Sequence, residues 1–258
     1  HDLQGMERYA EAELWFLRDL EARRRRNARP DRATQNDLLQ SARALANFHD
    51  GLQNWDKAEA FWLEVIAVSI AKDGESHRET LEWMGFLARS YHSAGAIDKQ
   101  IALLRRAQSL AAAGGADDDE QGYYTNYYNR QLADALTDAG RREEALAIID
   151  QVDGYEKANA DNALDRISNS DRRALLMAEG RFAEVEQILL GDIAMLESEG
   201  RQDLLAIPIL GLAGYHDARK QYDRSEPYWR RAIALADADG FSIFAIERQG
   251  LANSLELQ

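Results

Sequence analysis

The chain has 258 residues, a net charge of −14 and no cysteine. The negative charge argues against broad nucleic-acid binding, because phosphate contacts require a basic surface. The lack of cysteine excludes disulfides, thiol catalysis and cysteine-rich zinc sites, and it fits a reducing compartment. No apolar run reaches the roughly 18 residues of a membrane span. We therefore expect a cytoplasmic protein with no membrane segment.

The chain repeats itself. Residues Leu45 to Trp62 read LANFHDGLQNWDKAEAFW, and residues Leu212 to Trp229 read LAGYHDARKQYDRSEPYW. Further copies start at Leu87, Leu132 and Arg172, so that successive copies begin at 45, 87, 132, 172 and 212. Such a period is typical of units that bury their apolar faces only by stacking on their neighbours.

Apolar residues within each copy fall at helical spacing, stop at a turn and then resume. Each copy therefore predicts a helical hairpin. In chain order we expect a half-unit over 6–26, hairpins over about 35–72, 77–112, 122–152, 163–198 and 202–238, and a half-unit over 242–258.

Small residues recur where the two helices of a hairpin would cross. They follow the leading leucine of a copy (Ala46, Ala88, Ala133 and Ala213) or open the second helix (Ala12, Ala58, Ala145 and Ser225). A bulky side chain there would push the helices apart. The copy at Arg172 lacks the Leu-Ala pair, so we expect the weakest helix packing there and a joint between two stiffer halves.

This pattern, with Leu-Ala, an aromatic residue, a glycine in the turn, an aromatic residue and then alanine, resembles the tetratricopeptide repeat. The period is longer than the usual ~34 residues and resembles the kinesin-light-chain-like subtype, most of all between Ala71 and Gly95. The resemblance implies an all-α fold, a right-handed α-solenoid of antiparallel helix pairs, whose first helices line a concave groove.

No segment has the spacing of a zinc-protease helix (HExxH), a nucleophile elbow (GxSxG) or a phosphate-binding P-loop. His49 and His216 occupy equivalent positions in two copies, where Tyr91 stands in a third. We therefore interpret both histidines as packing residues, and we predict no catalytic residue, no metal ion and no cofactor.

One stripe of the first helices should face the groove, at two residues before, two after and five after each leading leucine. Together with Tyr127, from the run YYTNYYNR, the stripe gives the candidate peptide-binding residues Arg43, Asn47, Arg89, Tyr127, Arg130, Asp134, Ala174, Met177 and Leu210. Arginines bind carboxylates and tyrosines give rigid contact area. We expect an acidic segment of a peptide at the arginines and an apolar segment toward Leu210. Alternatively, two of the four tyrosines are core and the arginines pair with acids such as Asp134.

These observations favour a non-catalytic protein-interaction scaffold that binds an extended peptide or a partner surface. The half-units at both ends also suggest a piece of a longer protein. A second hypothesis is a regulatory or sensor arm of a larger bacterial signalling enzyme, such as a protease or a nucleotide-driven switch. A third, a stand-alone enzyme, is disfavoured because acid, base and metal ligands do not cluster in the sequence.

Overall fold

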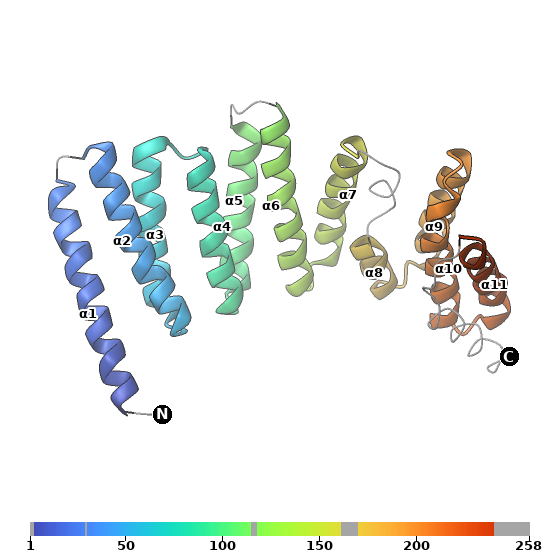
Figure 1. Cartoon of the computed structure of the whole chain (residues 1–258), viewed down its shortest axis with the longest axis horizontal. Coiled ribbons are helices and arrows are strands. Elements are labelled where there is room, and N and C mark those ends of the chain that lie inside the picture. Colours follow the sequence, from blue (N-terminus) through green and yellow to red (C-terminus); the bar gives the residue numbers. More distant parts are fainter. Residues whose placement is uncertain (1–2, 29, 115–117, 161–169, 240–258) are drawn as a thin grey trace. The chain divides into compact units, whose positions relative to one another are not determined.

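The computed structural model describes residues 3–28, 30–114, 118–160 and 170–239. In these ranges the chain forms α-helices and one 3-10 helix and no strand, so the predicted all-α fold is confirmed (Figure 1). The helices are α1 (Leu3–Arg26), α2 (Arg32–Gly51), α3 (Trp55–Asp73), α4 (Arg78–Ser93), α5 (Ile97–Ala113), α6 (Asp118–Asp138), α7 (Arg142–Ala158), α8 (Ser170–Ala178), α9 (Phe182–Ser198), η1 (Gln202–Leu204), α10 (Ala206–Ala218) and α11 (Tyr222–Asp239). None of these helices combines the length and apolar character that a membrane span requires.

The chain divides into two compact units, residues 1–148 and residues 149–258, with the boundary inside α7. Unit 1 holds α1 to α6 and the start of α7, and unit 2 holds the remaining helices. The predicted half-unit at 242–258 lies outside the described residues. That all the hairpins stack in a single solenoid over 1–258 stays a prediction.

Unit 1 is a series of helices packed in chain order, with α1 on α2, α2 on α3 and so on to α6 (Figure 1). The first residue of each sequence copy lies in its core, since Leu45, Leu87 and Leu132 are buried. Burying one such leucine contributes about 1.5–3 kcal/mol. The small residues expected at the helix crossings are buried as well, except Ala12, which is half-buried.

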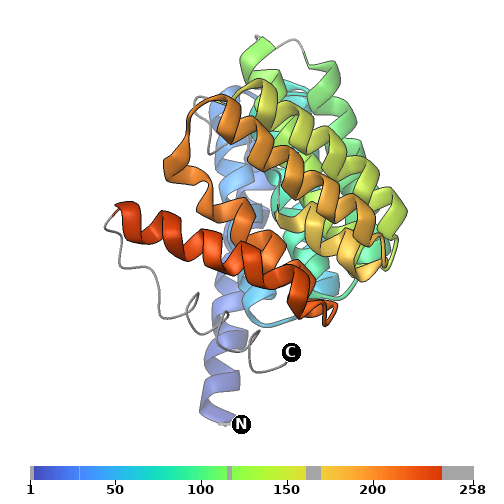
Figure 2. The same ribbon diagram turned by 90° about the vertical axis from the view of Figure 1, so that its right-hand side faces the viewer.

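Unit 2 contains the short helix α8 and the pairs α8 with α9 and α10 with α11, with α9 packed on α10. Figure 2 shows α11, in red, lying against α10. Arg172 and Arg173 are half-buried where other copies have Leu-Ala, and Arg172 Nε donates to Asp150 on α7 at 2.6 Å. The described core of α8 consists of Leu175 and Leu176.

The five hairpin turns share one geometry. In the first, Gln53 has φ of 56°, its N–H donates to Asp50 O, and the N–H of Asn54 donates to His49 O. This pair of bonds is the Schellman ending of a helix, which needs a left-handed residue. The equivalent left-handed residues of the other turns are Gly95, Gly140, Gly180 and Lys220.

His49 is buried at the contact between successive helix pairs. Its ring stacks on Phe61 at 5.6 Å, and its Nε2 lies 3.5 Å from Glu13 Oε1 on α1. Glu13 also receives the Lys57 ammonium at 2.6 Å. The Glu13 carboxylate therefore pairs with Lys57 on α3 and lies beside His49 on α2, without a hydrogen bond to either ring nitrogen.

The same arrangement recurs at two equivalent places. Tyr91 Oη donates to Glu59 at 2.8 Å, and Lys99 pairs with the same carboxylate. In unit 2, Glu186 lies 3.9 Å from His216 Nε2 and 2.7 Å from Arg224 Nη2. The equivalent first-helix positions in the other two copies are the buried Leu136 and Leu176. His49 and His216 thus pack as the sequence predicted.

The helix crossings predict a size limit at Ala58. We expect Ala58→Leu to lower the free energy of unfolding by about 1–3 kcal/mol, because the added atoms must push α2 and α3 apart. The control is Ala60→Leu, which adds the same atoms at an exposed position of the same helix. Chemical denaturation of the two variants measures the difference, and equal stabilities would contradict the crossing geometry.

The buried His49 predicts a dependence of stability on pH. Burial lowers the pKa of His49, opposed by the Glu13 and Asp50 carboxylates and aided by Lys57. As the pH falls below the unfolded value of 6.5, the unfolded chain binds a proton that the folded chain does not bind, so the free energy of unfolding decreases.

The control for this prediction is His49→Leu, which copies the residue found at the equivalent positions in two other copies. Between about pH 8 and about pH 5, the interval in which histidine titrates, the parent protein should lose more free energy of unfolding than His49→Leu. Parallel pH profiles would show that His49 contributes nothing to the change.

The copy that starts at Arg172, which lacks the Leu-Ala pair, predicts fast local opening of α8. Its core has two described residues, whereas α4 buries nine, from Thr80 to Tyr91. Opening free energies follow local burial, so we expect faster amide hydrogen exchange in 172–178 than in 81–91. Equal protection of the two segments would contradict the expectation that this copy forms a joint.

Candidate functional site

The candidate site residues lie on first helices in both units. Arg43 and Asn47 are on α2, Arg89 on α4, Tyr127, Arg130 and Asp134 on α6, Ala174 and Met177 on α8, and Leu210 on α10. The first six belong to unit 1 and the last three to unit 2. The site in unit 1 can therefore be described by itself.

Two hollows open on unit 1. One, of about 330 Å³, lies between α4 and α6 and is the tyrosine hollow, lined by Glu82, Gly85, Phe86, Arg89, Tyr123, Tyr124, Tyr127 and Tyr128. The other, of about 300 Å³, lies among α2, α3 and α4 and is the tryptophan hollow, lined by Asn47, Asp50, Trp55, Trp62, Phe86, Arg89, Ser90 and Ser93. Phe86 and Arg89 line both hollows. We call the two hollows together the groove.

Three of the candidate residues line the groove, namely Asn47, Arg89 and Tyr127. Arg43 lies outside both linings, with its guanidinium carbon 5.8 Å from the centroid of the buried Trp83 ring. Arg130 and Asp134 are exposed on α6 and line neither hollow. In unit 2, Ala174 is exposed, whereas Met177 and Leu210 are half-buried.

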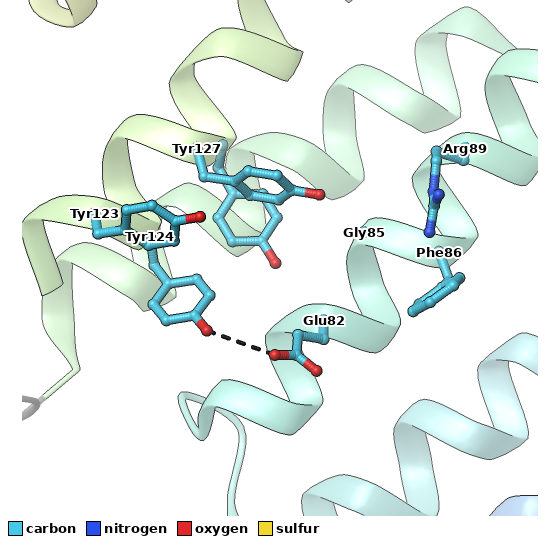
Figure 3. A pocket seen from close by; sticks show the side chains of 8 residues that line it. Glu82, Gly85, Phe86, Arg89, Tyr123, Tyr124 and Tyr127 are labelled. Carbon is cyan, nitrogen blue, oxygen red and sulfur yellow. Dashed lines mark hydrogen bonds between the residues drawn. The ribbon is translucent and has the colours of Figure 1, made fainter. Parts of the chain in front are cut away.

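The four tyrosines of α6 differ in burial. Tyr128 is fully buried, and its Oη donates to Leu81 O at 2.6 Å. Burial raises the pKa of Tyr128, so its hydroxyl stays protonated at neutral pH. Tyr124 is half-buried, and Tyr123 and Tyr127 are exposed at 61% and 42%. One tyrosine is thus core, and the rings of two others reach solvent beside the hollow (Figure 3).

Phe86 forms the shared wall of the groove. It stacks on Trp62 at 5.4 Å and lies 5.4 Å from Trp83, so a cluster of rings holds it in place. The Arg89 guanidinium carbon sits 4.4 Å from the Phe86 ring centroid (Figure 3). A guanidinium over an aromatic face keeps its edge N–H groups for other acceptors. Arg89 can therefore receive a carboxylate from either hollow.

Asp50 fixes the floor of the tryptophan hollow. Its Oδ2 accepts from Trp62 Nε1 at 2.8 Å, and its Oδ1 accepts from Ser90 Oγ at 2.6 Å. Because these three residues come from α2, α3 and α4, one carboxylate joins three helices. In unit 2, Trp229 Nε1 donates to Asp217 at 2.9 Å in the same way.

The sequence reasoning missed several groove residues, among them Asp50, Trp62, Glu82 and Phe86. The signal for the first two was present, since an aspartate after the histidine and a tryptophan twelve residues later recur in the two most similar copies. Phe86 lies beside the predicted stripe. Glu82 lies one turn before its first residue, at the repeat position that Tyr127 occupies in the next copy.

A cluster of Asp73, His77 and Glu79 brings three possible metal ligands within 4.8 Å of one another. The Lys72 ammonium lies 2.9 Å from Asp73 Oδ2 and 2.7 Å from Glu79 Oε2, and Arg32 also pairs with Asp73. Two cations already neutralise these carboxylates. The cluster therefore has the composition of an ion-pair network joining α2, α3 and α4.

Comparison with known proteins places the chain among helical repeats. No family model and no curated protein matches the sequence. Among solved structures, TPR-like repeats of a putative kinesin light chain from Podosopora anserina align with a TM-score of 0.55 and 19% identity over 78% of this chain and 96% of that one. The apo form of RapI aligns with a TM-score of 0.58 and 13% identity over 90% and 66%.

A third structure, aspartyl phosphate phosphatase F from Bacillus subtilis, aligns with a TM-score of 0.52 and 10% identity over 87% of this chain and 60% of that one. At these identities the likeness concerns the fold alone. It confirms the predicted tetratricopeptide-like helical repeat.

Proposed function

We propose that this tetratricopeptide-like chain is a non-catalytic scaffold that binds an extended peptide segment of a partner protein in the groove. The observation that carries the proposal is the meeting of two hollows at Phe86 and Arg89. Aromatic side chains supply five of the eight lining residues of the tyrosine hollow and three of the eight of the tryptophan hollow. Such residues dominate binding energy at protein interfaces. A peptide segment that runs along α4 in the groove would bury these rings.

Arg89 would bind a carboxylate of the peptide. Its guanidinium stands between the two hollows and is exposed, on a chain whose net charge of −14 otherwise repels acids. Arg43 and Arg130 would extend the attraction to either side, together with Asn47, Tyr127 and Asp134. In the full proposal an apolar segment of the partner lies against Ala174, Met177 and Leu210 of unit 2.

A second proposal keeps this groove and places it in a larger bacterial signalling enzyme as its regulatory arm. It is motivated by the fold shared with a phosphatase of Bacillus subtilis, in which the matched part is 60% of the chain. The complete gene tests this proposal. A protease domain or nucleotide-driven switch encoded with the repeats supports it, and a gene that ends with the repeats contradicts it.

The test of peptide binding uses a displayed library of random peptides selected on the protein, followed by fluorescence anisotropy with the enriched peptides. Arg89→Glu should weaken binding at least tenfold, because a charge-assisted hydrogen bond is worth about 1.5–3 kcal/mol. The control is Arg25→Glu on α1, which loses only the exposed pair with Glu21. Melting temperatures of both variants should stay close to that of the parent.

Two outcomes would overturn the proposal. A library without enriched peptides would mean that the groove does not bind extended chains. Enriched peptides that bind Arg89→Glu as tightly as the parent protein would place their binding on another surface of the molecule.

A further inference from the structure

We infer that the tyrosine hollow receives a cationic side chain, lysine or arginine, of the bound peptide, about three residues away from the acidic residue that Arg89 binds. This inference rests on the proposed function and adds the chemical class of a second peptide side chain that the groove binds. It differs from the sequence-based expectation, in which only an acidic segment of the peptide lies against the arginines and Tyr127.

The lining of the tyrosine hollow is the first reason. Five of its eight residues are aromatic: Phe86, Tyr123, Tyr124, Tyr127 and Tyr128. The rings meet edge to face, at 87° for Tyr123 with Tyr124 and 82° for Tyr127 with Tyr128, so they present faces in different directions. Ring faces carry the negative part of the aromatic quadrupole and attract a cation.

The free space in the hollow comes from Gly85. A Cβ at this position would stand 3.8 Å from Tyr128 Oη and 3.9 Å from Tyr127 Oη. A larger side chain would therefore extend into the space that these hydroxyls border. The glycine leaves room for a side chain of a partner between α4 and the tyrosines (Figure 3).

Glu82 gives the hollow its charge preference. It is the acidic residue of the lining, and Tyr124 Oη donates to its Oε1 at 3.5 Å (Figure 3). Its pair with Arg78, at 3.2 Å, is exposed on both sides. Exposed pairs contribute only about 0–1 kcal/mol, so Glu82 can pair with an incoming cation at low cost.

Competing ligands fit this end of the groove less well. An acidic or phosphorylated side chain beside the tyrosines would approach the Glu82 carboxylate, because Arg89, which also lines this hollow, stands about two helical turns further along α4. The buried Tyr128 hydroxyl already donates to Leu81 O. An uncharged apolar side chain would contact the rings and leave Glu82 without a partner from the peptide. A cation satisfies the rings and the carboxylate together.

The spacing between the basic and the acidic side chain of the peptide follows from the geometry of α4. Glu82 and Arg89 are seven residues apart on one helix, which corresponds to about 10.5 Å along its axis. An extended peptide advances about 3.3–3.6 Å per residue. A basic and an acidic side chain separated by about three residues therefore match the two charges.

The test uses synthetic variants of the strongest peptide from the displayed library. The basic residue at this spacing is replaced by norleucine, which keeps an unbranched apolar chain and removes the charge. On the parent protein the norleucine peptide should bind at least tenfold more weakly. On Glu82→Gln the two peptides should bind within about threefold of each other, because the carboxylate is gone.

Two further comparisons complete the design. Glu21→Gln also loses an exposed pair with an arginine four residues away, and it should keep the parent preference. Tyr127→Leu should weaken the lysine peptide more than Tyr127→Phe does, because only the phenylalanine keeps the ring.

The outcomes separate this inference from the proposed function. If enriched peptides require Arg89 but lack a basic residue at this spacing, or if Glu82→Gln keeps the full preference for lysine over norleucine, the inference is wrong and groove binding stands. If binding is independent of both Arg89 and Glu82, the proposed function fails as well.

Discussion

Within unit 1, each hairpin packs on the next, and the groove exists only because of that contact. Its walls come from α2, α3, α4 and α6, which belong to successive copies of the repeat. Asp50 shows how closely stacking and site are linked, because its carboxylate accepts from Trp62 and from Ser90. The bond from Trp62 closes the hairpin of α2 and α3, and the bond from Ser90 forms only when α4 of the next hairpin is in register with it, so recognition and packing depend on the same atoms.

The sequence predicted the helical hairpins well because their determinants are local. A small residue after the leading leucine recurs in four of the five copies and glycine at the turn in three, and repetition makes them visible. The groove was only partly predictable. The stripe predicts which residues lie on one face of a helix, and Asn47 and Arg89 were found in this way. It does not predict how deeply a residue is buried. Glu82 and Phe86 were missed, because Glu82 lies one turn before the stripe's first residue and Phe86 lies beside the stripe.

The contacts between hairpins are of two chemical kinds. At three places a glutamate of one hairpin holds an aromatic or imidazole ring and a cation of the next, as Glu59 does with Tyr91 and Lys99. Leu136 and Leu176 stand where the ring would be in the remaining copies. The polar kind places an ion pair between hairpins, with a hydrogen bond to the ring at Tyr91, whereas the leucines contribute burial without direction.

The turn residues have a consequence for handling the protein. Gln53 and Lys220 adopt left-handed backbone where the other three turns have glycine, at a cost of about 1–2 kcal/mol each. Glycine there would relieve this strain, less about 0.5–1 kcal/mol for its greater freedom in the unfolded chain. Neither residue lines the groove. Glycine at these two positions should therefore raise the free energy of unfolding modestly without altering the binding surface.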